Sequence, residues 1–179
     1  MPDSLTLDEL NTLPVEDAKS LLLRCCGSTE WARHVVMRRP FRTLAEVESA
    51  ADEVWHSLDR ADWLEAFAAH ARIGERDVPA VAAASSGWAE QEQSTARVAT
   101  SETLGRLAAA NRVYEDRFGY RFIVCATGRT AAEMLMFLEQ RLPNSAEVEL
   151  VVAADEQRKI TRLRLNKLLS TNDRGDREP

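Results

Sequence analysis

The chain has 179 residues and a mass of 20.0 kDa, a length that fits one domain able to bury about 70% of its unfolded surface. Hydrophobic residues make up 45% and charged residues 29%, an ordinary globular composition, and the net charge is −6. This negative charge argues against nucleic acid or an acidic membrane surface as the partner. A small anion is not excluded, because it needs only one local arginine.

Cysteine usage and the lack of targeting patterns indicate the cytoplasm. The three cysteines, of which Cys25 and Cys26 are adjacent, form neither a disulfide framework nor a metal motif. No apolar run approaches the roughly 20 residues needed to cross a bilayer. Residues 1–8 lack the basic and apolar regions of a signal peptide. We therefore expect a cytoplasmic protein with no membrane association.

Helix signals dominate the first half of the chain. Thr6 and Thr43 each precede an apolar run and are followed three residues later by glutamate, which predicts two capping boxes. Gly27 and Pro40 mark two expected helix ends. The expected helix starts are residues 6–9, 14–17, 28–31 and 43–46, with a further start after Asp59.

The stretch from Trp63 to Gly74 carries the first candidate for chemistry. Trp63 and Phe67 share one helix face with His70 through their i, i+4, i+7 spacing, so His70 projects from the apolar side. We expect Gly74 to stop this helix and leave His70 in its last turn. An imidazole, with an unperturbed pKa of about 6.5, suits proton transfer near neutrality. The alternative is a hydrogen-bonded core histidine.

The second half of the chain adds three expected helices and one extended segment. The helices cover residues 88–118, 130–142 and 145–169. Phe122–Cys125 is β-like, but one strand cannot form a sheet, so we interpret it as a buried extended segment. The sequence thus predicts an all-α protein: a single compact domain of about seven to nine helices over residues 1–169, with one short extended segment. Residues 170–179 are expected to form a polar, disordered tail.

Two further side chains and one segment are candidates for a site. Glu90 follows a Ser-Gly turn and falls in the first turn of a helix, where the dipole favours negative charge; an ordinary capping glutamate is the alternative. Arg164 lies between Ile160 and Leu168 on an apolar stripe, so its guanidinium either reaches water or meets a buried anion. The backbone of residues 122–126 either binds a polar ring or is a buried connector.

Other motifs that would indicate a different chemistry do not occur in the sequence. His34, His56 and His70 have no zinc-binding spacing, and there is no P-loop or Gly-x-Gly-x-x-Gly pattern. The run Ser85-Ser86-Gly87 lacks the flanking glycine of a nucleophile elbow. We therefore expect no metal site.

Several short motifs follow one another in order along nearly the whole chain. They are Cys25-Cys26-Gly27-Ser28 with Trp31, Arg39-Pro40-Phe41, Asp62 to Phe67 leading into His70-Ala71-Arg72-Ile73-Gly74, Glu90-Gln91, Asn111 with Tyr114-Glu115, Arg117-Phe118-Gly119-Tyr120, Phe122 to Cys125, and Lys159-Ile160 with Leu163-Arg164-Leu165. In this combination the chain resembles the 2-oxo-4-hydroxy-4-carboxy-5-ureidoimidazoline (OHCU) decarboxylase family. The whole set is more specific than any one motif.

The resemblance implies an all-α homodimer that uses no metal or organic cofactor. It implies decarboxylation of OHCU, a small anionic ureidoimidazoline, to (S)-allantoin and CO2 in urate breakdown. It gives catalytic positions to His70 and Glu90, for acid-base work, and to Arg164, for holding the anionic substrate. The substrate-lining residues that it implies are Ala71, Gly87, Trp88, Ala89, Gln91, Phe122, Ile123, Val124, Cys125 and Ala126. Functional coupling to urate oxidase and hydroxyisourate hydrolase is a further expectation.

One position departs from the family pattern. The family motif usually has proline directly after the histidine, whereas this chain has Ala71. Proline would fix the backbone there and remove an N–H, so we expect alanine to leave a looser helix end with one more donor. Two alternatives therefore stay open: a catalytically silent ureide-binding relative, and a lyase or hydrolase acting on a related purine-breakdown product.

Overall fold

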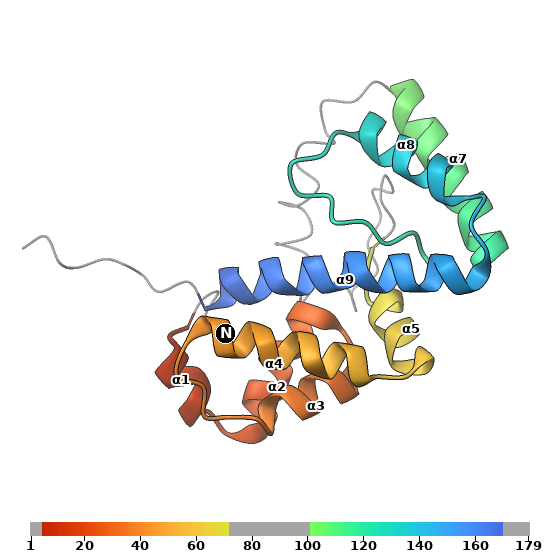
Figure 1. Ribbon diagram of the computed structural model, residues 1–179. Coiled ribbons are helices and arrows are strands. Elements are labelled where there is room, and N and C mark those ends of the chain that lie inside the picture. Colours follow the sequence, from red (N-terminus) through yellow and green to blue (C-terminus); the bar gives the residue numbers. More distant parts are fainter. Residues whose placement is uncertain (1–4, 72–100, 170–179) are drawn as a thin grey trace, which may run out of the picture.

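The computed structural model describes residues 5–71 and 101–169, and within these ranges the chain is helical (Figure 1). The described residues form eight α-helices and no β-strand, as the all-α prediction requires. The helices are α1 (Leu7–Thr12), α2 (Val15–Cys26), α3 (Thr29–Val36), α4 (Leu44–Ser57), α5 (Arg60–Ala68), α7 (Ser101–Phe118), α8 (Ala131–Arg141) and α9 (Ala146–Leu168). None of these helices has the length and apolarity that a membrane span would need.

The long helix α9 runs through the middle of the molecule (Figure 1). Helices α1 to α4 lie on one side of it, α7 and α8 lie on the other side, and α5 lies near its N-terminal end. Helices α2, α4 and α5 contact α9 directly, while α7 packs mainly against α8. The single compact domain that the sequence predicts is confirmed. The domain boundary at residue 169 stays a prediction.

Tryptophans join the helices around the core. Trp31 is fully buried in α3, and its indole Nε1 donates to the carbonyl of Ala51 in α4 at 3.0 Å. Trp55 reaches from α4 to α9 in the same way and donates to the carbonyl of Ala154 at 3.0 Å. Each tryptophan thus buries a large apolar surface while its one polar atom stays hydrogen-bonded. These bonds fix α4 between α3 and α9.

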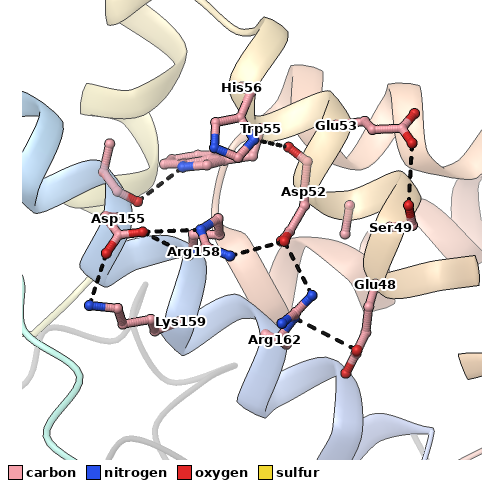
Figure 2. Close-up of polar contacts among 12 residues, drawn as sticks. Glu48, Ser49, Asp52, Glu53, Trp55, His56, Asp155, Arg158, Lys159 and Arg162 are labelled. Atoms are coloured by element: carbon pink, nitrogen blue, oxygen red, sulfur yellow. Dashed lines mark hydrogen bonds and ion pairs between the residues drawn. The ribbon is translucent and has the colours of Figure 1, made fainter. Parts of the chain in front are cut away.

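A chain of charged side chains lines the outer edge of the contact between α4 and α9 (Figure 2). Asp52 of α4 accepts from Arg158 at 3.0 Å and from Arg162 at 3.3 Å. Arg158 also pairs with Asp155 at 2.8 Å, and Arg162 lies 3.7 Å from Glu48. Because solvent-accessible ion pairs contribute little stability individually, we interpret them as fixing the register of α4 against α9.

Not every predicted capping box is present at the helix starts. The capping box at Thr6 is confirmed, and Thr130 forms another. Thr43 does accept from the backbone N–H of Glu46, but the Glu46 carboxylate accepts from the backbone N–H of Arg42 instead of returning to Thr43. The second half of that predicted box is therefore wrong. The Arg42 guanidinium donates to the same carboxylate and so favours the contact with Arg42 over the one with Thr43.

The later elements also follow the sequence pattern. The described part of the long helix, α7, ends at Phe118, and Gly119 follows with a φ of 79°. The expected start of that helix near Trp88 lies outside the described residues. Residues 121–126 form no helix or strand, and Phe122, Ile123, Val124 and Ala126 are buried. The predicted buried extended segment is therefore confirmed.

Candidate active site

His70 follows directly after the C-terminal end of α5, and that end comes earlier than the sequence predicts. The helix ends at Ala68, not at Gly74, and Ala69 closes it by donating to the carbonyls of Ala66 and Phe67. A side chain distant in the sequence contacts this helix end, because the Arg121 guanidinium donates to the carbonyls of Ala68 (3.0 Å) and His70. Gly74 itself lies outside the described residues.

A glycine lets the ends of α2 and α5 meet beside His70. Gly27 closes α2 with a φ of 85°, in the left-handed region. A Cβ atom at this position would lie 2.6 Å from the Cβ of Ala69, the residue just before His70. The close approach of the two helix ends therefore depends on the missing side chain of Gly27.

The His70 side chain is partly buried, and its hydrogen bond goes to α9. The ring atom Nε2 lies 2.6 Å from Oε1 of Gln157. Gln157 is completely buried. Its amide Nε2 lies 3.4 Å from the carbonyl oxygen of Cys26, at the end of α2, and 3.2 Å from Oγ1 of Thr161. One side chain of α9 thus connects the ends of α2 and α5.

Two described arginines place positive charge near the imidazole. Arg164 is 5% exposed and lies two turns beyond Gln157 on α9. Burial, helped by the charges of Arg164 and Arg121, lowers the pKa of His70 to about 3, and the hydrogen bond with Gln157 opposes only part of this shift. The imidazole is therefore neutral at physiological pH. A neutral ring keeps a lone pair that can accept a proton, but its lowered pKa makes it a weak base until a bound anion offsets the guanidinium charges.

Arg121 also contacts the backbone next to Ala71, the position where the family motif usually has proline. The carbonyl that Arg121 holds belongs to His70, so it is part of the peptide bond that leads into Ala71. A side chain from another segment thus fixes the backbone at the position where proline would restrict it. The expectation that alanine leaves a looser helix end stays a prediction.

The extended segment is held against α9 by the residue next to Gln157. The backbone N–H of Cys125 donates to Oε2 of Glu156 at 2.7 Å. The carbonyl of Ile123 accepts from Nη1 of Arg141, at the end of α8, at 2.8 Å. The backbone of this segment is therefore fixed from both sides.

Arg141 in turn belongs to a buried polar cluster. Its guanidinium donates to Oε1 of Glu149 at 2.5 and 2.8 Å, and Glu149 is completely buried. The Tyr114 hydroxyl donates to the same carboxylate oxygen, and Asn144 donates to the other at 2.8 Å. Burial and this hydrogen bond raise the pKa of Tyr114, so the phenol stays protonated. The cluster joins α7, α8 and α9 beneath the extended segment.

The described part of the predicted site therefore assembles around α9. His70, Arg164 and the segment Phe122–Ala126 come from three distant parts of the chain. Arg164 belongs to α9, and His70 is hydrogen-bonded to Gln157 of α9. The segment is held to α9 through Cys125 and Glu156. The other predicted residues lie outside the described residues: Glu90, Gly87, Trp88, Ala89 and Gln91. Within the described ranges no three His, Cys, Asp or Glu side chains are grouped in a way that could hold a metal ion.

Sequence reasoning missed Gln157, Glu156 and Arg121. Gln157 had a detectable signal, because it lies seven residues before Arg164 and so occupies the same apolar stripe. A buried amide on such a stripe needs a partner. Glu156 and Arg121 carry no comparable signal, since the site atoms that they bind are backbone atoms of segments distant in sequence; the other partner of Glu156 is Lys159, three residues further on.

Comparison with known proteins identifies the family of the chain. The family model described as OHCU decarboxylase matches residues 11–166. A uric acid degradation bifunctional protein of Arabidopsis thaliana, TTL, is 43% identical over 147 residues, which cover 82% of this chain and 45% of that protein. The chain thus spans less than half the length of this relative. The OHCU decarboxylase of Amia calva is 29% identical over 131 residues, covering 73% of this chain and 75% of its own.

A solved structure has the same fold. The crystal structure of an OHCU decarboxylase in the presence of (S)-allantoin superposes with a TM-score of 0.71 at 41% identity, covering 83% of this chain and 96% of that one. The family model, the relatives and the fold agree. The chain therefore belongs to the OHCU decarboxylase family.

Proposed function

We propose that this protein decarboxylates OHCU to (S)-allantoin and CO2 without an organic cofactor. The family membership and the similarity to a decarboxylase crystallised in the presence of (S)-allantoin support the proposal. The observation that carries it is a neutral, hydrogen-bonded imidazole that feels the charge of a buried arginine, His70 with Arg164. These two groups fit an anionic substrate from which a proton must be taken.

The substrate can serve as its own electron sink. One ring carbon carries both the carboxylate and a hydroxyl, and the neighbouring ring carbon, which carries the ureido group, forms a C=N bond. When the bond to the carboxylate breaks, CO2 leaves and its electron pair forms a C=C bond between the two ring carbons, while the ring nitrogen takes a proton. The hydroxyl loses its proton as CO2 leaves, and its oxygen becomes a carbonyl when the ureido-bearing carbon gains a proton. Protonation on a single face gives the S product.

The catalytic roles follow from charge and protonation state. Arg164 would hold the substrate carboxylate through a forked contact. His70, being neutral, would accept the hydroxyl proton as CO2 leaves and return a proton to one face of the ring. Glu90 would orient the imidazole or bind the ureido group. Ala71, the Gly87–Gln91 stretch and the backbone of Phe122–Ala126 would line the substrate.

Chirality is the decisive measurement, because this substrate also loses CO2 without an enzyme. OHCU would be generated in place from urate with urate oxidase and hydroxyisourate hydrolase, and circular dichroism would follow the product. We expect a rapid (S)-allantoin signal with the wild-type protein and none above background with His70→Ala. The half-exposed residue His34 offers a matched control, and His34→Gln should keep the wild-type rate.

Two results would contradict the proposal. A slow, optically silent drift to racemic product with the wild-type protein would favour a catalytically silent ureide-binding relative. Turnover of another purine-breakdown product in place of OHCU would favour the related lyase or hydrolase. Unchanged turnover by His70→Ala would reject the role given to His70 while leaving the overall reaction in place.

We also propose a cytoplasmic homodimer that is functionally coupled to the preceding enzymes of urate breakdown. Cys25, Cys26 and Cys125 carry reduced thiols, which supports a reducing compartment. Relatives in Arabidopsis thaliana and Bacillus subtilis are described as bifunctional uric acid degradation proteins, which supports the coupling. Light scattering during gel filtration would test the dimer. To test the coupling, the rate of allantoin formation from urate would be measured with all three enzymes mixed and with the enzymes acting in sequence. We expect the mixture to be faster.

A further inference from the structure

The orientation of the Gln157 amide is determined by its surroundings. A backbone carbonyl can only accept hydrogen bonds, and the carbonyl of Cys26 lies 3.4 Å from Nε2 of Gln157. The NH2 group must therefore face Cys26, and Thr161 accepts from it as well at 3.2 Å. This places the amide oxygen Oε1 toward His70. A flipped amide would set two carbonyl oxygens against each other in a buried position.

The amide oxygen in turn determines where the His70 proton lies. At 2.6 Å from a carbonyl oxygen, the Nε2 atom of His70 must carry hydrogen, since two facing lone pairs would repel. A neutral imidazole has a single N–H. Among the residues that the structure describes, the charged groups acting on the ring are Arg164 from α9 and Arg121 from the segment after α7, and both disfavour a second proton. The other ring nitrogen, Nδ1, therefore keeps its lone pair.

We propose that Gln157 is a positioning residue that holds His70 in the tautomer with the proton on Nε2 and the basic lone pair on Nδ1. Its catalytic consequence rests on the proposed decarboxylation: Nδ1 is then the atom that accepts the substrate hydroxyl proton. Cys26 and Thr161 take part indirectly, because their oxygens fix the amide that selects the tautomer. Gln157 itself exchanges no proton with the substrate.

Nitrogen NMR of the histidine rings tests the tautomer without any substrate. The chain has only three histidines, so a sample labelled with ¹⁵N-histidine gives three ring spectra. His56 provides an internal reference of the opposite kind, because its Nδ1 lies 2.7 Å from the backbone carbonyl of Asp52 and donates to it (Figure 2). His34→Gln and His56→Gln assign the remaining signals.

At about pH 8, where an ordinary imidazole is neutral, we expect His70 to carry its proton on Nε2 and His56 to favour Nδ1. A wild-type His70 ring protonated on Nδ1 would overturn the proposal, whether or not the protein decarboxylates OHCU. Conversely, a ring protonated on Nε2 supports it even if the proposed reaction fails. The two failures are therefore distinguishable.

Two substitutions of Gln157 separate positioning from general support of the fold. Gln157→Met removes the acceptor, so the two His70 nitrogen resonances should move toward each other as tautomers mix. We expect kcat to fall about 3- to 10-fold, the range for one neutral hydrogen bond, with KM unchanged. Resonances that stay at their wild-type positions would overturn the proposal. If this variant fails to fold, the wild-type spectrum still decides the tautomer.

Gln157→Glu keeps an acceptor but adds negative charge. The carboxylate can still accept the proton on Nε2 of His70, so the tautomer should be retained. Its charge should raise the pKa of His70 despite the opposing charges of Arg164 and Arg121, and the acid limb of the kcat profile should move to higher pH. A merely structural role would lower the melting temperature without moving that limb. A profile that superposes on the wild-type profile would overturn the proposal.

Discussion

Glu156 and Gln157 are adjacent on α9, yet they bind two different parts of the candidate site. Glu156 accepts the backbone N–H of Cys125 at 2.7 Å, while Gln157 binds the ring of His70 at 2.6 Å. Because these two residues are consecutive, α9 fixes the distance between the His70 imidazole and the extended segment. This arrangement makes α9 the element that positions the site.

The first prediction concerns the extended segment. Glu156→Ala leaves the N–H of Cys125 without its carboxylate acceptor, a change that costs about 1–3 kcal/mol when the donor is buried. We expect kcat/KM for OHCU to fall about tenfold as the segment shifts. Glu156→Gln keeps an acceptor oxygen and should lose less. Steady-state kinetics of the two variants would contradict the prediction if their losses were equal.

The second prediction concerns the meeting of α2 and α5. Gly27→Ala combines a left-handed φ with a Cβ only 2.6 Å from that of Ala69, so we expect the free energy of unfolding to fall by about 2–4 kcal/mol. Gly119→Ala is the matched control, because its φ is also positive but nothing lies within 4 Å of the added Cβ. It should cost about 1–2 kcal/mol.

Urea denaturation measures both values. Because Ala69 precedes His70, Gly27→Ala should also lower kcat, whereas Gly119→Ala should leave it closer to wild type. Equal stability losses at the two glycines would mean that the helix ends move apart without cost, and would contradict the close approach described here.

The third prediction concerns the dependence of stability on pH. The folded protein keeps His70 neutral because its pKa is lowered to about 3, whereas the unfolded chain takes up this proton near pH 6.5. Between these values the unfolded state binds more protons, so stability is present above pH 6.5 and is lost as the pH falls toward 3.

Removing the imidazole should remove this contribution. In His70→Asn, the slope of the unfolding free energy against pH between 6 and 4 should decrease by up to about 1.4 kcal/mol per pH unit. Urea denaturation at several pH values measures that slope. An identical slope in wild type and variant would show that His70 gains its proton in the folded protein too.

The fourth prediction concerns the buried ion pair of Arg141 and Glu149. Arg141→Met leaves a fully buried carboxylate without its cation and should lower the free energy of unfolding by about 3–5 kcal/mol. Combining it with Glu149→Leu should restore part of that loss, because the uncompensated charge disappears. Urea denaturation of the single and double variants tests this. A double variant less stable than Arg141→Met would contradict the explanation.

The sequence-based expectations succeed where the determinants are local. The capping threonines at residues 6 and 130 begin helices because their partners lie three residues away. The capping box predicted at Thr43 does not form completely, because the Glu46 carboxylate has a competing donor in Arg42, one residue before the cap. Family resemblance supplied the candidate residues, since their spacing alone left structural alternatives open for His70 and Arg164.

The remaining features depend on contacts distant in the sequence. His70 and Gln157 are separated by 87 residues, so no local pattern could pair them. The end of α5 likewise has a partner that is distant in sequence, because Arg121 donates to the carbonyl of His70, 51 positions earlier. Only the packing of α5 and the extended segment on α9 brings these groups together.

The regular geometry of α9 also limits how the chain length can vary in relatives. Gln157 and Arg164 are seven residues apart, which is about two helical turns and about 10 Å along the axis, so they lie on the same face. One residue inserted or deleted between them would rotate Arg164 by about 100° relative to Gln157. Exchanges on the outer face of this stretch, as at Lys159 or Arg162, leave the spacing intact. Functional relatives should therefore differ here by substitution and never by a change of length.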